Sequence, residues 1–142
     1  MLFRSGLVAT VGSYYAQTEK ITVLSFIVAI PMGALACAIL AVNNIRDRAQ
    51  DELVGKRTVA VRLGDAKARR SFVALLVLAH TAAIATFIPT AMLTLLAAPL
   101  TFSISKVVLS GASGRDLIPV LGRTGKLQLL FASLFAIALA IQ

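Results

Sequence analysis

The chain has 142 residues, of which 58% are hydrophobic and only 14% are charged, and its formal net charge is +8. Ordinary soluble domains are about 45–50% apolar, so this composition excludes a water-soluble globular protein and predicts an all-α integral membrane helix bundle. The single cysteine, Cys37, excludes an internal disulfide and a cysteine-based metal site.

About five transmembrane helices are expected, and the apolar stretches that predict them are 7–16, 21–42, 71–87, 90–109 and 127–141. The stretch 21–42 would form a helix of about 33 Å, which matches a hydrocarbon core of about 30 Å. The stretch 7–16 also resembles the apolar part of a secretory signal peptide. The pair Tyr14 and Tyr15 favours an interfacial anchor instead.

The stretch 21–42 carries small residues at four-residue spacing. Gly33, Cys37 and Ala41 would share one face of a helix, and such a ridge allows two helices to approach closely in lipid. Pro31 in the same stretch and Pro99 in a later one each predict a kink. Close packing of this helix would fix the position of the polar segment that follows it.

Basic residues gather between the apolar stretches, mostly on one side of the predicted membrane. Eight of the 14 Lys and Arg residues lie between positions 43 and 71. The positive-inside rule therefore makes 43–70 a polar cytoplasmic loop in a multi-pass protein of the cell inner membrane. Because topology accounts for the positive charge, we expect no nucleic-acid partner.

Two carboxylates stand four residues apart just after the apolar stretch 21–42. If the helix continues past this stretch, Asn43, Asp47 and Asp51 lie on one face. Carboxylates about 6 Å apart repel by roughly 3 kcal/mol at an effective dielectric near 20, and a hard cation relieves this repulsion. Asp47 and Asp51 are therefore candidate metal-binding and catalytic residues, with Mg²⁺ as the expected cofactor.

A basic pair follows these carboxylates. Lys56 and Arg57 come directly after Gly55, a residue that allows a tight turn close to a ligand. Their charges suit a diphosphate, and Arg46 or Arg62 could add to them. The same residues also fit a solvated loop in which acidic and basic side chains pair with one another and set the topology.

The order of the residues from 43 to 64, N-N-I-R-D-R-A-Q-D-E-L-V-G-K-R-T-V-A-V-R-L-G, resembles the second aspartate-rich motif of the UbiA superfamily of membrane prenyltransferases. Within that superfamily, G-K-R-T-V-A-V-R-L-G is most similar to the 1,4-dihydroxy-2-naphthoate polyprenyltransferases of menaquinone biosynthesis. Residues 6–18 and 116–131 are also similar, more weakly, so the likeness covers most of the chain.

The resemblance implies a nine-helix fold in which Mg²⁺ bridges two aspartate-rich loops to a polyprenyl diphosphate. It also implies transfer of the polyprenyl group to an aromatic acceptor, with 1,4-dihydroxy-2-naphthoate as the first choice. Carried over by matching position, the metal-binding residues would be Asp47 and Asp51. With Arg46 added for its charge, the candidate diphosphate-binding residues are Lys56, Arg57, Arg46, Asn43 and Asn44.

The first motif of that superfamily, N-D-x-x-D, is not in the sequence. We therefore expect residues 1–142 to form a single transmembrane domain that corresponds to the C-terminal half of such an enzyme. Little turnover is expected from it alone, and a missing N-terminal half would be its partner. Two alternatives stay open: a non-catalytic truncated or split membrane fragment, and part of an anion transporter. The transporter alternative predicts polar groups near the bilayer midplane.

Overall fold

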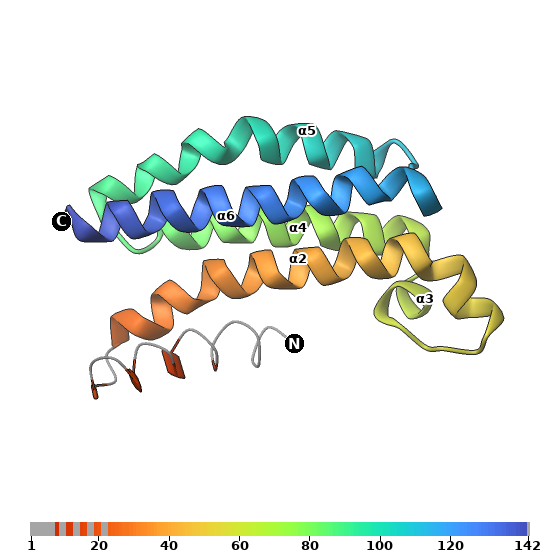
Figure 1. Cartoon of the computed structure of the whole chain (residues 1–142), viewed down its shortest axis with the longest axis horizontal. Coiled ribbons are helices and arrows are strands. Elements are labelled where there is room, and N and C mark those ends of the chain that lie inside the picture. Colours follow the sequence, from red (N-terminus) through yellow and green to blue (C-terminus); the bar gives the residue numbers. More distant parts are fainter. Residues whose placement is uncertain (1–7, 9–10, 13–14, 17–18, 21–22, 142) are drawn as a thin grey trace.

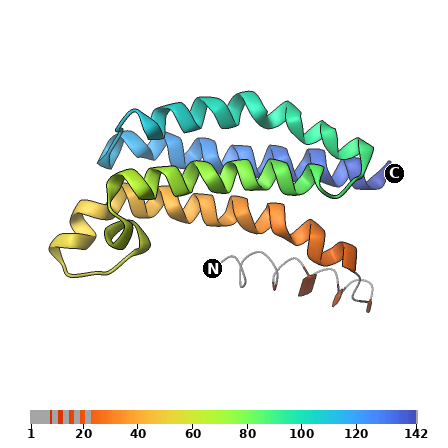
Figure 2. The ribbon, with the colours of Figure 1, turned by 180° about the vertical axis from the view of Figure 1, so that it is seen from behind.

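The structure, a computed structural model, describes residues 8, 11–12, 15–16, 19–20 and 23–141. Its named elements are all helices, in the order α2 (Val23–Leu53), α3 (Val59–Leu63), α4 (Asp65–Ile84), the 3-10 helix η2 (Pro89–Ala97), α5 (Ala98–Leu109), the 3-10 turn η3 (Gly114–Leu117) and α6 (Ile118–Ala140). Helices α2, α4, α5 and α6 run along one axis, and the short α3 lies at one end of them (Figure 1). Seen from behind, α4 lies between α2 and α5 (Figure 2).

The predicted membrane helix bundle is confirmed. Among the described residues, three helical segments are long and apolar enough to cross a membrane: Ser25–Leu53, Pro89–Leu109 and Gly114–Ala140. The predicted stretch 71–87 lies mainly in α4. This helix is not among the three segments, because its first turns carry several charged residues. Half of the predicted stretch 7–16 lies outside the described residues.

The prediction of a polar loop over 43–70 is wrong in its structure, because most of that segment is helical. Helix α2 continues to Leu53, a short connection covers 54–58, and α3 and α4 take up most of the rest. Arg, Gln, Glu and Ala in the continuing segment are good helix formers, and Arg48 and Glu52 pair at 3.4 Å one turn apart. The condition for Asn43, Asp47 and Asp51 to share a helix face is therefore met.

Helices α2 and α4 form the most extensive helix pair in the bundle. Their contact is built from small residues of α2 and larger ones of α4, and its fully buried members include Ala34, Ala38, Phe72 and Leu76. The predicted small-residue ridge is only partly a packing surface. Gly33 is buried, but Cys37 and Ala41 line a cavity. The adjacent small residues, one position further along the helix, make the close approach.

Pro31 and Pro99, the two prolines predicted to kink helices, occupy different positions. Pro31 lies inside α2. Pro99 lies where the 3-10 helix η2 passes directly into α5, so the change of helix type falls at a residue that cannot donate a main-chain hydrogen bond. His80 is a buried residue of α4 whose ring meets the ring of Phe131 edge-on at 5.1 Å, so it belongs to the packed core.

Candidate functional site

The last turns of α2 carry the two aspartates in different surroundings. Asp47 is partly exposed and accepts two hydrogen bonds from Arg46, one at 2.7 Å from Nε to Oδ1 and one at 2.8 Å from Nη2 to Oδ2. This bidentate pair neutralises Asp47 within the helix. Arg46, which was predicted to bind a diphosphate, is therefore engaged by a neighbouring carboxylate in this structure.

Asp51 is buried, with 6% of its surface exposed. Its Oδ1 accepts a hydrogen bond from Nζ of Lys56 at 3.1 Å, and its main-chain carbonyl accepts one from the N–H of Lys56 at 2.8 Å. Its Oδ2 is buried and has no hydrogen-bond partner among the described residues. A buried carboxylate oxygen without a partner is unfavourable, so this atom is where the segment best fits a cation.

The short turn after α2 is shaped by one glycine and one cap. Gly55 adopts φ +70°, in the left-handed region that glycine enters without strain. Thr58 caps α3 by accepting a hydrogen bond on Oγ1 from the N–H of Val61 at 3.4 Å. Between these two points, Lys56 and Arg57 project from a turn that is held at both ends.

Gly55→Ala is expected to lower the free energy of unfolding by about 1–2 kcal/mol, because an L-residue is strained at this φ although its Cβ would meet nothing within 4 Å. Thermal unfolding in detergent measures the loss. The matched control is Gly122→Ala in α6, where the added Cβ also has open space and the φ is not positive. That variant should gain about 0.5–1 kcal/mol, and equal shifts of the two midpoints would contradict the account.

A cavity of about 810 Å³ lies between α2, α3 and α4. Apolar side chains from all three helices make up most of its wall, among them Leu40, Leu63 and Leu78. The polar side chains that reach it include Asn44, Lys56 and Arg57. Because α2 and α4 run antiparallel from the turn, these polar groups lie toward the turn end and Leu78 lies toward the far end.

The structure brings together only part of the predicted site. Asn44, Lys56 and Arg57 line the cavity, and Asp51 adjoins them through its bond to Lys56. Asp51 itself is not part of the cavity wall, and neither are the other predicted residues on α2, Asn43, Arg46 and Asp47. In the part of the chain that the structure describes, no group of three or more His, Cys, Asp or Glu side chains could hold a metal ion.

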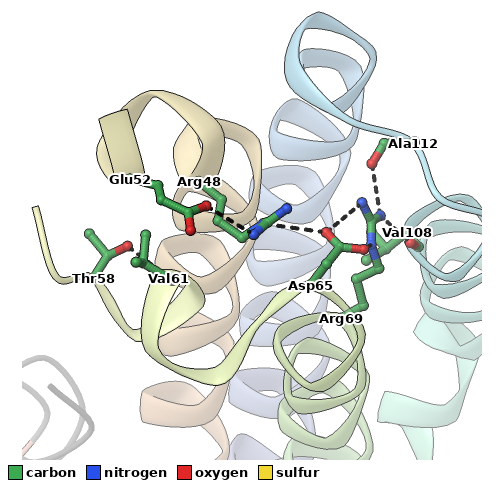
Figure 3. Close-up of polar contacts among 8 residues, drawn as sticks. All are labelled: Arg48, Glu52, Thr58, Val61, Asp65, Arg69, Val108 and Ala112. Atoms are coloured by element: carbon green, nitrogen blue, oxygen red, sulfur yellow. Dashed lines mark hydrogen bonds and ion pairs between the residues drawn. The ribbon is translucent and has the colours of Figure 1, made fainter. Parts of the chain in front are cut away.

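One charged residue of this region was not identified from the sequence. Arg69 is only 6% exposed and donates to Asp65 from Nε at 2.6 Å and from Nη2 at 3.0 Å. Figure 3 shows the same guanidinium reaching two main-chain carbonyls, with Arg48 on the other side of Asp65. The hydrogen bonds from Arg69, together with the charges of Arg69 and Arg48, hold the pKa of Asp65 below its usual value. The Asp–Arg spacing of four residues is the signal in the sequence that points to this pair, but the positive-inside rule accounts for the basic residues of the segment without it.

Residues 1–117 match the UbiA prenyltransferase family, so the chain belongs to this family. It is 40% identical over 140 residues to a 1,4-dihydroxy-2-naphthoate octaprenyltransferase of Mycobacterium tuberculosis, a match that covers 95% of this chain and 47% of the relative. Proteins of the same name are 37% identical over 138 residues in Mycobacterium leprae (96% and 47% covered) and 34% identical over 140 residues in Escherichia coli (94% and 45% covered). The chain spans about half the length of these curated relatives. No solved structure matches it significantly.

Proposed function

We propose that this chain supplies part of the polyprenyl diphosphate site of a prenyltransferase in menaquinone biosynthesis, with 1,4-dihydroxy-2-naphthoate as the acceptor. The observation that carries the proposal is the cavity between α2, α3 and α4, which is apolar along most of its wall and has Asn44, Lys56 and Arg57 near one end. A polyprenyl diphosphate has the same division, since a long apolar chain ends in a compact charged group.

The charged end of the substrate would be held by the turn after α2. Lys56 and Arg57 are exposed cations at the cavity, and charge-assisted hydrogen bonds to phosphate oxygens are among the strongest that side chains make. Asn44, on the part of α2 that lines the cavity, would add an amide donor. Arg46 and Asn43 lie beside the aspartates on α2 but do not line the cavity, and Arg46 would act on the diphosphate by exchanging its bonds to Asp47 for bonds to phosphate oxygens.

The donor atoms of α2 fit Mg²⁺. The unpartnered Oδ2 of Asp51 is a hard oxygen ligand, and Asp47 lies one turn earlier on the same helix face. Mg²⁺ usually takes one or two carboxylates and completes its shell with waters and substrate phosphates, so two aspartates from this chain suffice as its contribution. When bound, the ion would neutralise the charge of the leaving diphosphate.

In the proposed reaction the bond between C1 of the prenyl chain and the diphosphate oxygen breaks, and C1 forms a new bond to the aromatic ring. The ring carboxylate departs as CO₂, and the diphosphate leaves with the electron pair of the broken bond. The apolar wall of the cavity would keep water away from the allylic cation. The basic end of the bundle would face the cytoplasm at the cell inner membrane.

The single thiol of the chain allows a direct test of occupancy, because Cys37 is half-buried and lines the cavity. Alkylation of Cys37 by N-ethylmaleimide in detergent should slow about tenfold when a polyprenyl diphosphate with Mg²⁺ is present at ten times its Kd. The matching polyprenyl alcohol should protect only at higher concentration. Cys37→Ser verifies the labelled position. Equal alkylation rates with and without the diphosphate would contradict the proposed site.

A further inference from the structure

Arg69 is a buried cation of α4 that the proposed substrate site does not use directly. Its Nη1 donates to the carbonyl of Val108 at 2.6 Å and to that of Ala112 at 2.7 Å. Carbonyls at the C-terminal end of a helix have no partner within the helix, so the bond to Val108 satisfies the end of α5, and the bond to Ala112 ties the connection after α5 to α4. The other two nitrogens of the guanidinium, Nε and Nη2, point toward Asp65.

Those nitrogens hold Asp65, the first residue of α4, in a bidentate pair. On its other side, Nε of Arg48 in α2 lies 3.7 Å from Oδ1 of the same carboxylate. Figure 3 shows this row of charged side chains running from α2 across the start of α4 toward the end of α5. Asp65 is therefore fixed between two helices at the point where α3 ends.

Helix α3 is only five residues long and forms one wall of the cavity through Val59, Ala60 and Leu63. Such a short helix has little stability of its own, so its position depends on what holds its two ends. Thr58 caps the first end, directly after Arg57, and Asp65 follows the second end by two residues. A shift of Asp65 would therefore move α3 and the turn that carries the two cations.

We infer that Asp65 and Arg69 are positioning residues for the diphosphate end of the cavity. They hold α3, and with it Lys56 and Arg57, in place at the cavity while contacting no ligand themselves. This inference rests on the proposed function, because it assigns the two cations to a diphosphate. It separates Arg69, which is buried, from the exposed basic residues Lys67 and Arg70 of the same helix.

The test compares two ligands in the same chain by protection of Cys37 from alkylation. Arg69→Met is expected to raise the Kd for polyprenyl diphosphate about tenfold, the equivalent of one weakened hydrogen bond to a charged group, and to leave the Kd for polyprenyl alcohol within about twofold. Arg69→Lys keeps the charge but lacks the fork that joins the carboxylate to the two carbonyls, so it should show an intermediate loss. Arg70→Met, an exposed neighbour on α4, is the matched control.

Binding is measured well below the thermal midpoint of each variant, so that stability and positioning are read separately. Should Arg69→Met fail to fold, Arg69→Lys and Arg48→Gln carry the test. Folded Arg69 variants with an unchanged Kd for the diphosphate, or with equal increases for both ligands, would overturn the inference. The unsubstituted chain decides the proposed function independently, because equal Kd values for diphosphate and alcohol in that chain would contradict it before any variant is made.

Discussion

Asp51→Asn is expected to slow polyprenyl transfer by about 100-fold or more, because loss of the proposed metal ligand should exceed the 10–100-fold effect typical of residues that only support ligands. Asparagine keeps the shape of the side chain but removes its negative charge and one carboxylate oxygen. The buried Oδ2 of Asp51 has no protein partner among the described residues, whereas Oδ1 accepts a hydrogen bond from Lys56 that an asparagine oxygen can still accept, so the main loss should fall on the proposed cation site.

The measurement needs a complete enzyme, since the chain spans about half the length of its relatives. A chimera in which this chain replaces the matching segment of the Mycobacterium tuberculosis relative provides one, with 1,4-dihydroxy-2-naphthoate as acceptor. Asp51→Asn should also require more Mg²⁺ for half-maximal rate, and Asp47→Asn should behave similarly. Asp116→Asn, an exposed carboxylate of η3, is the matched control. An active chimera with an unchanged rate and unchanged Mg²⁺ dependence in both aspartate variants would refute the metal assignment.

Replacing both Lys56 and Arg57 with glutamine is expected to raise the Kd for polyprenyl diphosphate about 100-fold, since each removed cation ends one charge-assisted hydrogen bond of about 1.5–3 kcal/mol. The Kd for polyprenyl alcohol should stay nearly unchanged, because the apolar wall of the cavity is intact. Protection of Cys37 from alkylation measures both constants. Added salt should weaken diphosphate binding in the unsubstituted chain and have little effect in the double variant.

The control for this experiment also removes two positive charges, from residues close to Lys56 and Arg57 in the sequence. Lys67→Gln with Arg70→Gln alters two exposed cations in the first turns of α4 that do not line the cavity. If both double variants weaken the diphosphate equally, the attraction is a general effect of positive charge and not a site. Arg57→Gln alone is informative as well, because Lys56 also bonds to Asp51 and its loss changes that carboxylate.

The parts of the candidate site that could be predicted from the sequence lie close together along the chain, at the end of α2 and in the following turn with Lys56 and Arg57. Asn43, Asp47 and Asp51 share a face because of their four-residue spacing, and that expectation is met once α2 continues to Leu53. The polar loop expected over 43–70 differs from the structure because a run of charged residues is typical of a loop, although Arg, Lys and Glu are also good helix formers. The sequence allows pairing between acidic and basic side chains of this segment, but it does not specify that Asp47 pairs with Arg46.

Composition and residue order along the chain were sufficient to determine the membrane class and the prenyltransferase family, because both depend on local properties of the chain. Only the tertiary structure decided that Lys56, Arg57 and Asn44 meet at an apolar cavity while Asp47 lies outside its wall. Arg69 and the carbonyl of Val108 are 39 residues apart, so their bond exists only because α4 packs against the end of α5. Contacts of this kind depend on how helices pack against each other, so they cannot be predicted from the helical spacing of residues within one segment.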